Sequence, residues 1–123
     1  MADQNDVRRI ALYLPEVTED TGHFAFRVDG KQFVWAWMER VEPKRARVSS
    51  KQVIAVRVAN ELEKQSLLAL DTDAFFTEPH YNGYPAVLVR LAAINLDLLE
   101  TVLTDAWRTK APRRLLAAFQ TSP

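Results

Sequence analysis

A two-residue turn signal between aromatic strands most constrains the fold of this 123-residue chain. Asp29-Gly30 is typical of a tight hairpin in which both central residues take positive φ. Such a turn places Phe26 opposite Phe33 and, two residues further out, brings Phe24 opposite Trp35. Because side chains alternate across a strand, one face of this hairpin is predicted to be aromatic. Its members are Phe24, Phe26, Phe33, Trp35 and Trp37. We expect helices to cover this face.

The other face of the hairpin has a mixed composition. Its members are His23, Ala25, Arg27, Gln32, Val34, Ala36 and Met38. A face with both charged and apolar side chains is expected to be only partly covered.

Hydrophobic periodicity and capping residues predict the remaining elements. An apolar stripe at helical spacing ends at Pro15, and its members are Val7, Ile10, Ala11 and Leu14. Residues 16–22 are expected to form a polar turn. Further strands are predicted over 53–58, 75–77 and 86–91, with helices over about 60–70, from Asn95 to Ala111, and after Pro112. This order predicts an α+β fold with a mainly antiparallel sheet of about five strands and helices packed on one face.

Composition restricts the function classes. Sixteen Lys and Arg residues balance sixteen Asp and Glu residues, so the whole chain has no electrostatic bias toward nucleic acid. Without cysteine there is no disulfide, thiol nucleophile or thiolate metal site. The start of the chain is acidic and lacks an apolar signal core, and no later segment is apolar enough to span a bilayer. We expect a cytoplasmic, single-domain protein over residues 1–123, with no membrane association.

Three segments together resemble a known family. They are the hairpin Phe24–Phe33, the run Phe75–Leu91 with its Glu78-Pro79-His80-Tyr81-Asn82-Gly83-Tyr84-Pro85 loop, and Asp105–Leu115. These segments are similar to those of the MmcQ/YjbR family of small cytoplasmic α+β proteins. The resemblance implies a fold like that of secretion chaperones, with some likeness to frataxin, and a proposed "double wing" DNA-binding arrangement. Many members carry a lysine near the end of the third strand, where this chain has Arg57. The resemblance supplies no catalytic set.

The loop before the last strand is a candidate binding loop through His80, Tyr81 and Tyr84. In one interpretation it is a scaffold turn whose tyrosines anchor it by ring burial, while His80 hydrogen-bonds the loop backbone. In the other, the tyrosines stack on bases or grip a partner and His80 is a contact residue.

Two basic clusters are candidate nucleic-acid contacts. The first comprises Lys44, Arg45, Arg47 and Lys51, and the second comprises Arg108, Lys110, Arg113 and Arg114. Both clusters can be interpreted as solvated faces. The second can also be interpreted as cations that complement the dipole at a helix C-terminus. If both fold onto one side, they form a phosphate-binding strip.

Two functions follow from these patterns. The first is weak, mostly backbone-directed DNA binding by a protein that is not an enzyme. The second is a protein-interaction or chaperone-like module that grips a partner or a second copy through Val34, Ala36 and Met38 or a strand edge. An enzyme or small-molecule binder around His80, Tyr81 and Arg90 ranks behind both, because no catalytic or cofactor-binding motif is present. No cofactor or metal is expected.

Overall fold

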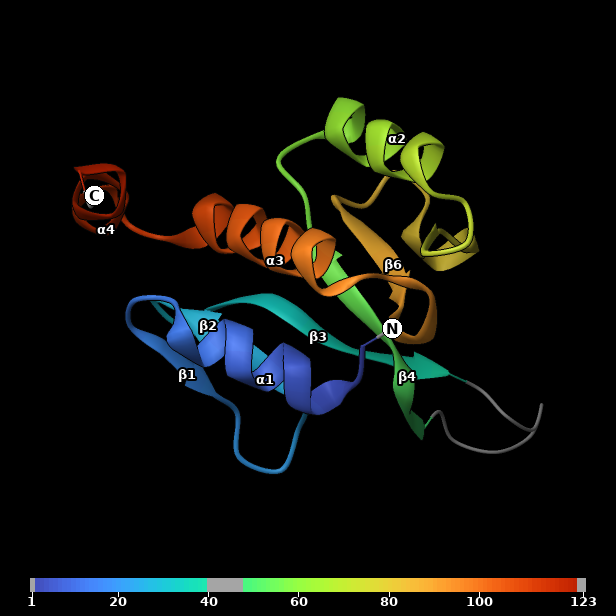
Figure 1. Ribbon diagram of the computed structural model, residues 1–123, viewed down its shortest axis with the longest axis horizontal. Coiled ribbons are helices and arrows are strands. Elements are labelled where there is room, and N and C mark those ends of the chain that lie inside the picture. Colours follow the sequence, from blue (N-terminus) through green and yellow to red (C-terminus); the bar gives the residue numbers. More distant parts are fainter. Residues whose placement is uncertain (1, 40–47, 122–123) are drawn as a thin grey trace.

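The computed structural model describes residues 2–39 and 48–121 (Figure 1). The elements are α1 (Gln4–Tyr13), β1 (Val17–Glu19), β2 (Ala25–Val28), β3 (Lys31–Glu39), β4 (Val48–Arg57), α2 (Glu61–Leu70), β5 (Phe75–Phe76), β6 (Ala86–Arg90), α3 (Leu96–Lys110) and α4 (Arg113–Thr121). Two short 3-10 helices, η1 (Pro79–Tyr81) and η2 (Leu91–Ala93), flank β6. The α+β prediction is confirmed.

The strands form one sheet in the order β1-β2-β3-β4-β6-β5, with every neighbouring pair antiparallel. It has six strands, not the five predicted from the sequence. The additional strand is β1, which lies in the segment predicted to be a polar turn and pairs Val17 with Val28. A three-residue edge strand is too short to show a two-residue period in the sequence, and the contacts that order it are non-local. It pairs with the β2 backbone, and Glu19 accepts two hydrogen bonds from Arg8 of α1.

Helices α1 and α3 cover one face of the sheet (Figure 1). The core between these layers includes Phe26, Val56 and Val87 from the strands and Leu103 and Trp107 from α3. Helix α2 contacts β5 and β6, and α4 follows α3 after a break at Ala111 and Pro112.

The prediction of an aromatic face is only partly correct, because β3 contains a β-bulge. Arg27 pairs with Gln32, but Phe26 pairs with Val34, so Phe33 is the extra residue and remains unpaired. Phe33 and Val34 are both fully buried in the core. A bulge shifts the side-chain alternation of every residue beyond it.

As a result, Trp35 lies on the face opposite the helices, contrary to the prediction, and pairs with Ala25 and not with Phe24. Trp37 lies on the same face, where its ring meets that of Phe76 edge to face. Val34 and Ala36 are buried, and Ala36 pairs with the core residue Ile54. The apolar grip proposed for Val34, Ala36 and Met38 is therefore wrong. Only Met38 of the three has a largely exposed side chain.

Candidate nucleic-acid interface

The sheet face opposite the helices, here called the open face, carries a continuous cross-strand row. From β2 to β5 the paired residues are Ala25, Trp35, Ala55, Leu88 and Phe76. Ala25, Ala55 and Leu88 are buried although they lie outside the helix-covered core. These three residues therefore lie beneath the larger side chains of the same face, among them Trp35 and Phe76.

Four side chains join on this face and form what we call the aromatic–arginine cluster: Trp35, Arg57, Tyr81 and Tyr84. The indole Nε1 of Trp35 donates a 3.3 Å hydrogen bond to Tyr81 Oη. The Tyr81 and Tyr84 rings meet edge to face with centroids 5.8 Å apart. The Arg57 guanidinium lies 4.9 Å from the Tyr84 ring centroid and 5.7 Å from that of Trp35. These contacts therefore link all four side chains of the cluster to one another.

Arg57 is the electrostatic centre of the cluster. Its Nε is buried and has no hydrogen-bond partner among the described residues, and none of their carboxylates forms an ion pair with it. Ring faces stabilise a cation but do not satisfy its N–H donors. The Nη groups of Arg57 make no hydrogen bond to the described residues either, so the guanidinium retains donors for an anionic group such as a phosphate or carboxylate.

A buried lysine positions the loop that carries the two tyrosines. Lys64 of α2 is 1% exposed, and its Nζ donates to the backbone carbonyls of Tyr81 and Tyr84, the latter at 3.0 Å. Burial lowers the pKa of the Lys64 ammonium from its ordinary value. The far end of the loop is held by Val58, whose backbone N–H donates to the Pro85 carbonyl. The aromatic–arginine cluster is therefore held from both sides.

Two hollows lie beside Trp35 on this surface. One has a volume of about 360 Å³ and is lined by Gln32, Trp35, His80, Tyr81 and Tyr84. His80 and Tyr84 are exposed, and the His80 imidazole makes no hydrogen bond to the described loop backbone. The predicted binding-loop residues therefore come together, joined by two side chains from the sheet.

The second hollow has a volume of about 460 Å³, and its lining includes His23, Ala25, Arg27, Gln32 and Trp35. Its one carboxylate among the described residues is Asp20. Arg27 holds Asp20 at 2.8 Å, and that hydrogen bond keeps the pKa of this carboxyl below its ordinary value. Gln32 Nε2 also donates to Asp20, at 3.3 Å. The negative charge of Asp20 is thus compensated by Arg27 within the protein.

The two predicted basic clusters do not meet in the described part of the chain. Lys44, Arg45 and Arg47 lie outside the described residues. Lys51 is exposed near the start of β4. Figure 1 shows β4 and α4 well apart along the long axis of the molecule.

Two of the four residues of the second basic cluster are engaged with carboxylates. Arg114 binds Glu16 through two hydrogen bonds of 2.7 and 2.8 Å, and this contact lowers the pKa of Glu16. Arg108 pairs with Asp105 at 3.2 Å. Lys110 is half-buried and Arg113 is exposed. These residues do not form a continuous positive strip with Lys51.

Arg90 lies apart from the loop with which it was grouped in the enzyme hypothesis. Its guanidinium sits 4.0 Å from the Phe76 ring centroid and donates to the Asp73 carbonyl. The family resemblance singled out the position of Arg57, but neither Arg57 nor Lys64 was predicted to be a site residue. A single cation at the end of a strand and one lysine on a short helix carry no local pattern that indicates burial.

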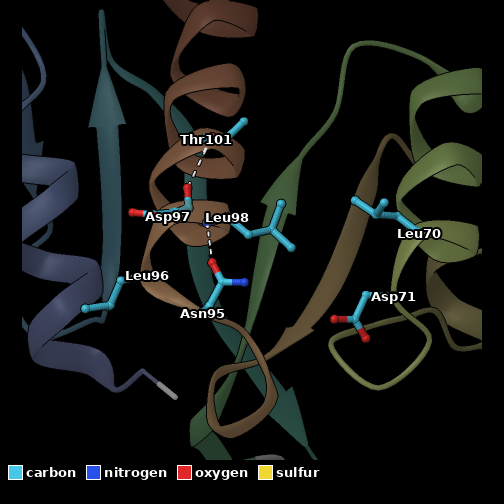
Figure 2. Close-up of a pocket in the computed structure, with 7 residues that line it drawn as sticks. All are labelled: Leu70, Asp71, Asn95, Leu96, Asp97, Leu98 and Thr101. Atoms are coloured by element: carbon cyan, nitrogen blue, oxygen red, sulfur yellow. Dashed lines mark hydrogen bonds between the residues drawn. The ribbon is translucent and has the colours of Figure 1, made fainter.

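Another hollow, of about 770 Å³, lies between the end of α2 and the start of α3 (Figure 2). Its polar groups serve the local structure. Asn95 caps α3 by accepting from the Leu98 N–H, and Asp71 accepts from the Asp73 and Ala74 N–H groups. Its ionisable side chains are the carboxylates Asp71 and Asp97, which disfavour an anionic ligand.

The chain matches a protein-family model named YjbR over residues 12–109. It belongs to the YjbR family. It is 40% identical over 125 residues to the uncharacterized proteins Rv2570 and MT2646 of Mycobacterium tuberculosis and Mb2600 of Mycobacterium bovis. Each alignment covers 97% of this chain and 96% of its relative.

A solved structure supports the fold of this YjbR protein. The crystal structure of Deinococcus radiodurans protein DR2400, with a DUF419 domain, superposes with a TM-score of 0.61 at 18% identity. The match covers 87% of this chain and 77% of that one. Residues 2–39 and 48–121 contain no helix long and apolar enough to cross a membrane, and no cluster of metal-ligating side chains.

Proposed function

We propose that this YjbR protein is a non-enzymatic nucleic-acid-binding module whose contact surface is the open face of its sheet. The aromatic–arginine cluster is the centre of that surface. The observation that carries the proposal is Arg57, a partly buried guanidinium lying against two aromatic rings without an ion pair among the described residues.

The chemistry of nucleic acid fits this arrangement. A phosphate accepts hydrogen bonds from a guanidinium, and a base stacks on an aromatic ring. Both donor and rings are present at one place in the aromatic–arginine cluster. Arg57 supplies one strong phosphate contact where the predicted strip would supply many, so we expect weak binding with a shallow salt dependence.

A protein-interaction module is the second candidate, on a different surface. Tyr13 is 88% exposed at the end of α1, beside a groove of about 480 Å³ lined by Ile10, Leu14 and Phe119. Exposed apolar surface of this kind marks contact sites in many proteins. The sheet edges are poorer candidates, because β1 and β5 have only three and two residues.

The charge of Arg57 is the first quantity to test. We expect Arg57→Gln to weaken binding of a fluorescein-labelled oligonucleotide about five- to tenfold at low salt and to flatten the salt dependence by about one phosphate contact. Arg57→Lys should retain most of the salt dependence, because the charge stays. Fluorescence anisotropy over a series of salt concentrations measures both quantities.

The matched control is Arg113→Gln, which removes the same charge from exposed α4. We expect it to leave affinity and salt dependence unchanged. If Arg113→Gln weakens binding while Arg57→Gln does not, the contact surface is the α3–α4 region and not the open face. If no oligonucleotide binds the wild-type protein at low salt, the protein-interaction candidate replaces this one.

A further inference from the structure

The open face carries two hollows that have Trp35 and Gln32 in their walls. Resting on the function proposed above, we propose that its ligand is an unpaired strand, with neighbouring bases seated in the two hollows on either side of Trp35. Arg57 then contacts the backbone phosphate beside one of these bases.

The first step of the argument is the layout of the hollows. Both have Trp35 and Gln32 in their walls, so these two side chains form the ridge between them, and Trp35 is its aromatic part. Their volumes, about 360 and 460 Å³, fall in the range of pockets that bind small planar molecules. A strand that crosses the ridge therefore has a seat for a base on each side.

The second step is charge complementarity. Arg57 lies against the Trp35 ring, and His80 lines the first hollow. Arg27 and His23 line the second hollow, where the one carboxylate among the described residues, Asp20, is already bound to Arg27. A phosphodiester chain along this path meets hydrogen-bond donors. As far as the structure describes them, the walls of the two hollows contain no carboxylate that lacks an ion pair.

The third step is geometry. In a duplex the bases are stacked against each other and paired, so their ring faces are closed to a tryptophan side chain. Only an unpaired strand can turn its bases outward onto an aromatic ridge and into hollows beside it. The described cations also do not form the extended strip that a duplex backbone needs.

The test compares one labelled sequence as single-stranded DNA, as single-stranded RNA and as a DNA duplex, by fluorescence anisotropy at low salt. We expect the single strands to bind at least about tenfold more tightly than the duplex. Trp35→Ala should weaken single-strand binding about tenfold, as expected for the loss of a stacked base, and leave the weak duplex binding nearly unchanged. Comparison of the DNA and RNA arms shows whether the ribose hydroxyl contributes.

Two further variants keep the test independent of folding. Trp35→Phe preserves a stacking ring and should retain most of the single-strand affinity. Tyr13→Ala removes an aromatic ring that is 88% exposed on the helix side and should change nothing. Equal or tighter duplex binding, or an equal loss of both ligands in Trp35→Ala, would overturn this inference while leaving the proposed function standing. Absence of binding to all three ligands would overturn both.

Discussion

Replacement of Trp107 by Ala is expected to lower the free energy of unfolding by about 4 kcal/mol. Trp107 is fully buried in α3 and is among the largest side chains of the core. Its ring contacts Phe119 of α4 with centroids 5.0 Å apart, and its Nε1 donates to the Pro15 carbonyl at 3.0 Å. The substitution thus leaves a cavity, removes one packing partner of α4 and leaves a carbonyl without its donor. Urea unfolding followed by circular dichroism measures the loss.

A conservative variant separates these contributions. Trp107→Phe keeps most of the ring volume but not the hydrogen bond to Pro15, so we expect a loss of about 1–2 kcal/mol. The exposed residue Tyr13 provides the control, because Tyr13→Ala should stay within about 0.5 kcal/mol of the wild type. A loss below about 2 kcal/mol in Trp107→Ala would contradict the central position of this residue in the core.

Lys64→Met is expected to lower the free energy of unfolding by about 2 kcal/mol and also to weaken oligonucleotide binding. Methionine retains the buried chain length, but the carbonyls of Tyr81 and Tyr84 lose their donor. The loop is then no longer held in the position that brings both rings to Arg57. Lys64 is a positioning residue, so the loss of affinity should accompany increased exchange of the amide hydrogens in residues 77–85. Unchanged exchange in this loop would show that Lys64 does not hold it.

The stability difference between the wild type and Lys64→Met is expected to depend on pH with a defined sign. Burial lowers the pKa of Lys64 in the folded state, so between that value and the unfolded value of about 10.4 the unfolded chain binds more protons. Stability from this group therefore rises with pH across that window. We expect the stability difference between wild type and Lys64→Met to increase as the pH rises through that window. A difference that decreases with pH would contradict the burial of the ammonium.

Local capping chemistry made the helix boundaries predictable. Asn60 and Asn95 accept hydrogen bonds from the N–H groups of Glu63 and Leu98, so the start of each helix depends on residues next to it in the sequence. For α1 the sequence left Asp3 and Asn5 open as the cap, and Asp3 is the residue that caps it; Pro112 precedes α4. The prediction of a turn at Asp29-Gly30 was likewise correct, because both residues have positive φ.

The bulge at Phe33 could not be read from the sequence. Alternation of apolar residues along β3 fits either register, because both Phe33 and Val34 are apolar. The register of β3 is set by β4, whose Val56 pairs with Val34 on the helix-covered face. This long-range pairing moves Trp35 to the open face and thereby creates the candidate site.

The candidate site was predicted in part. His80, Tyr81 and Tyr84 are concentrated in one short loop, and this composition indicated a shaped surface. Lys64 gave no such signal, since a lysine on a short helix is usually solvated. Its burial depends on two carbonyls that lie 17 and 20 residues further along the chain.

The most direct test of the central claim is a titration of the 15N-labelled protein with a single-stranded oligonucleotide, followed by NMR. We predict that the indole N–H signal of Trp35 and the backbone signals of Arg57, Tyr81 and Tyr84 shift most. The buried indole of Trp107 serves as an internal reference that should not move. The largest shifts at Arg113 and Arg114, or at Tyr13, with the Trp35 signal unchanged, would contradict the assignment of the open face as the binding surface.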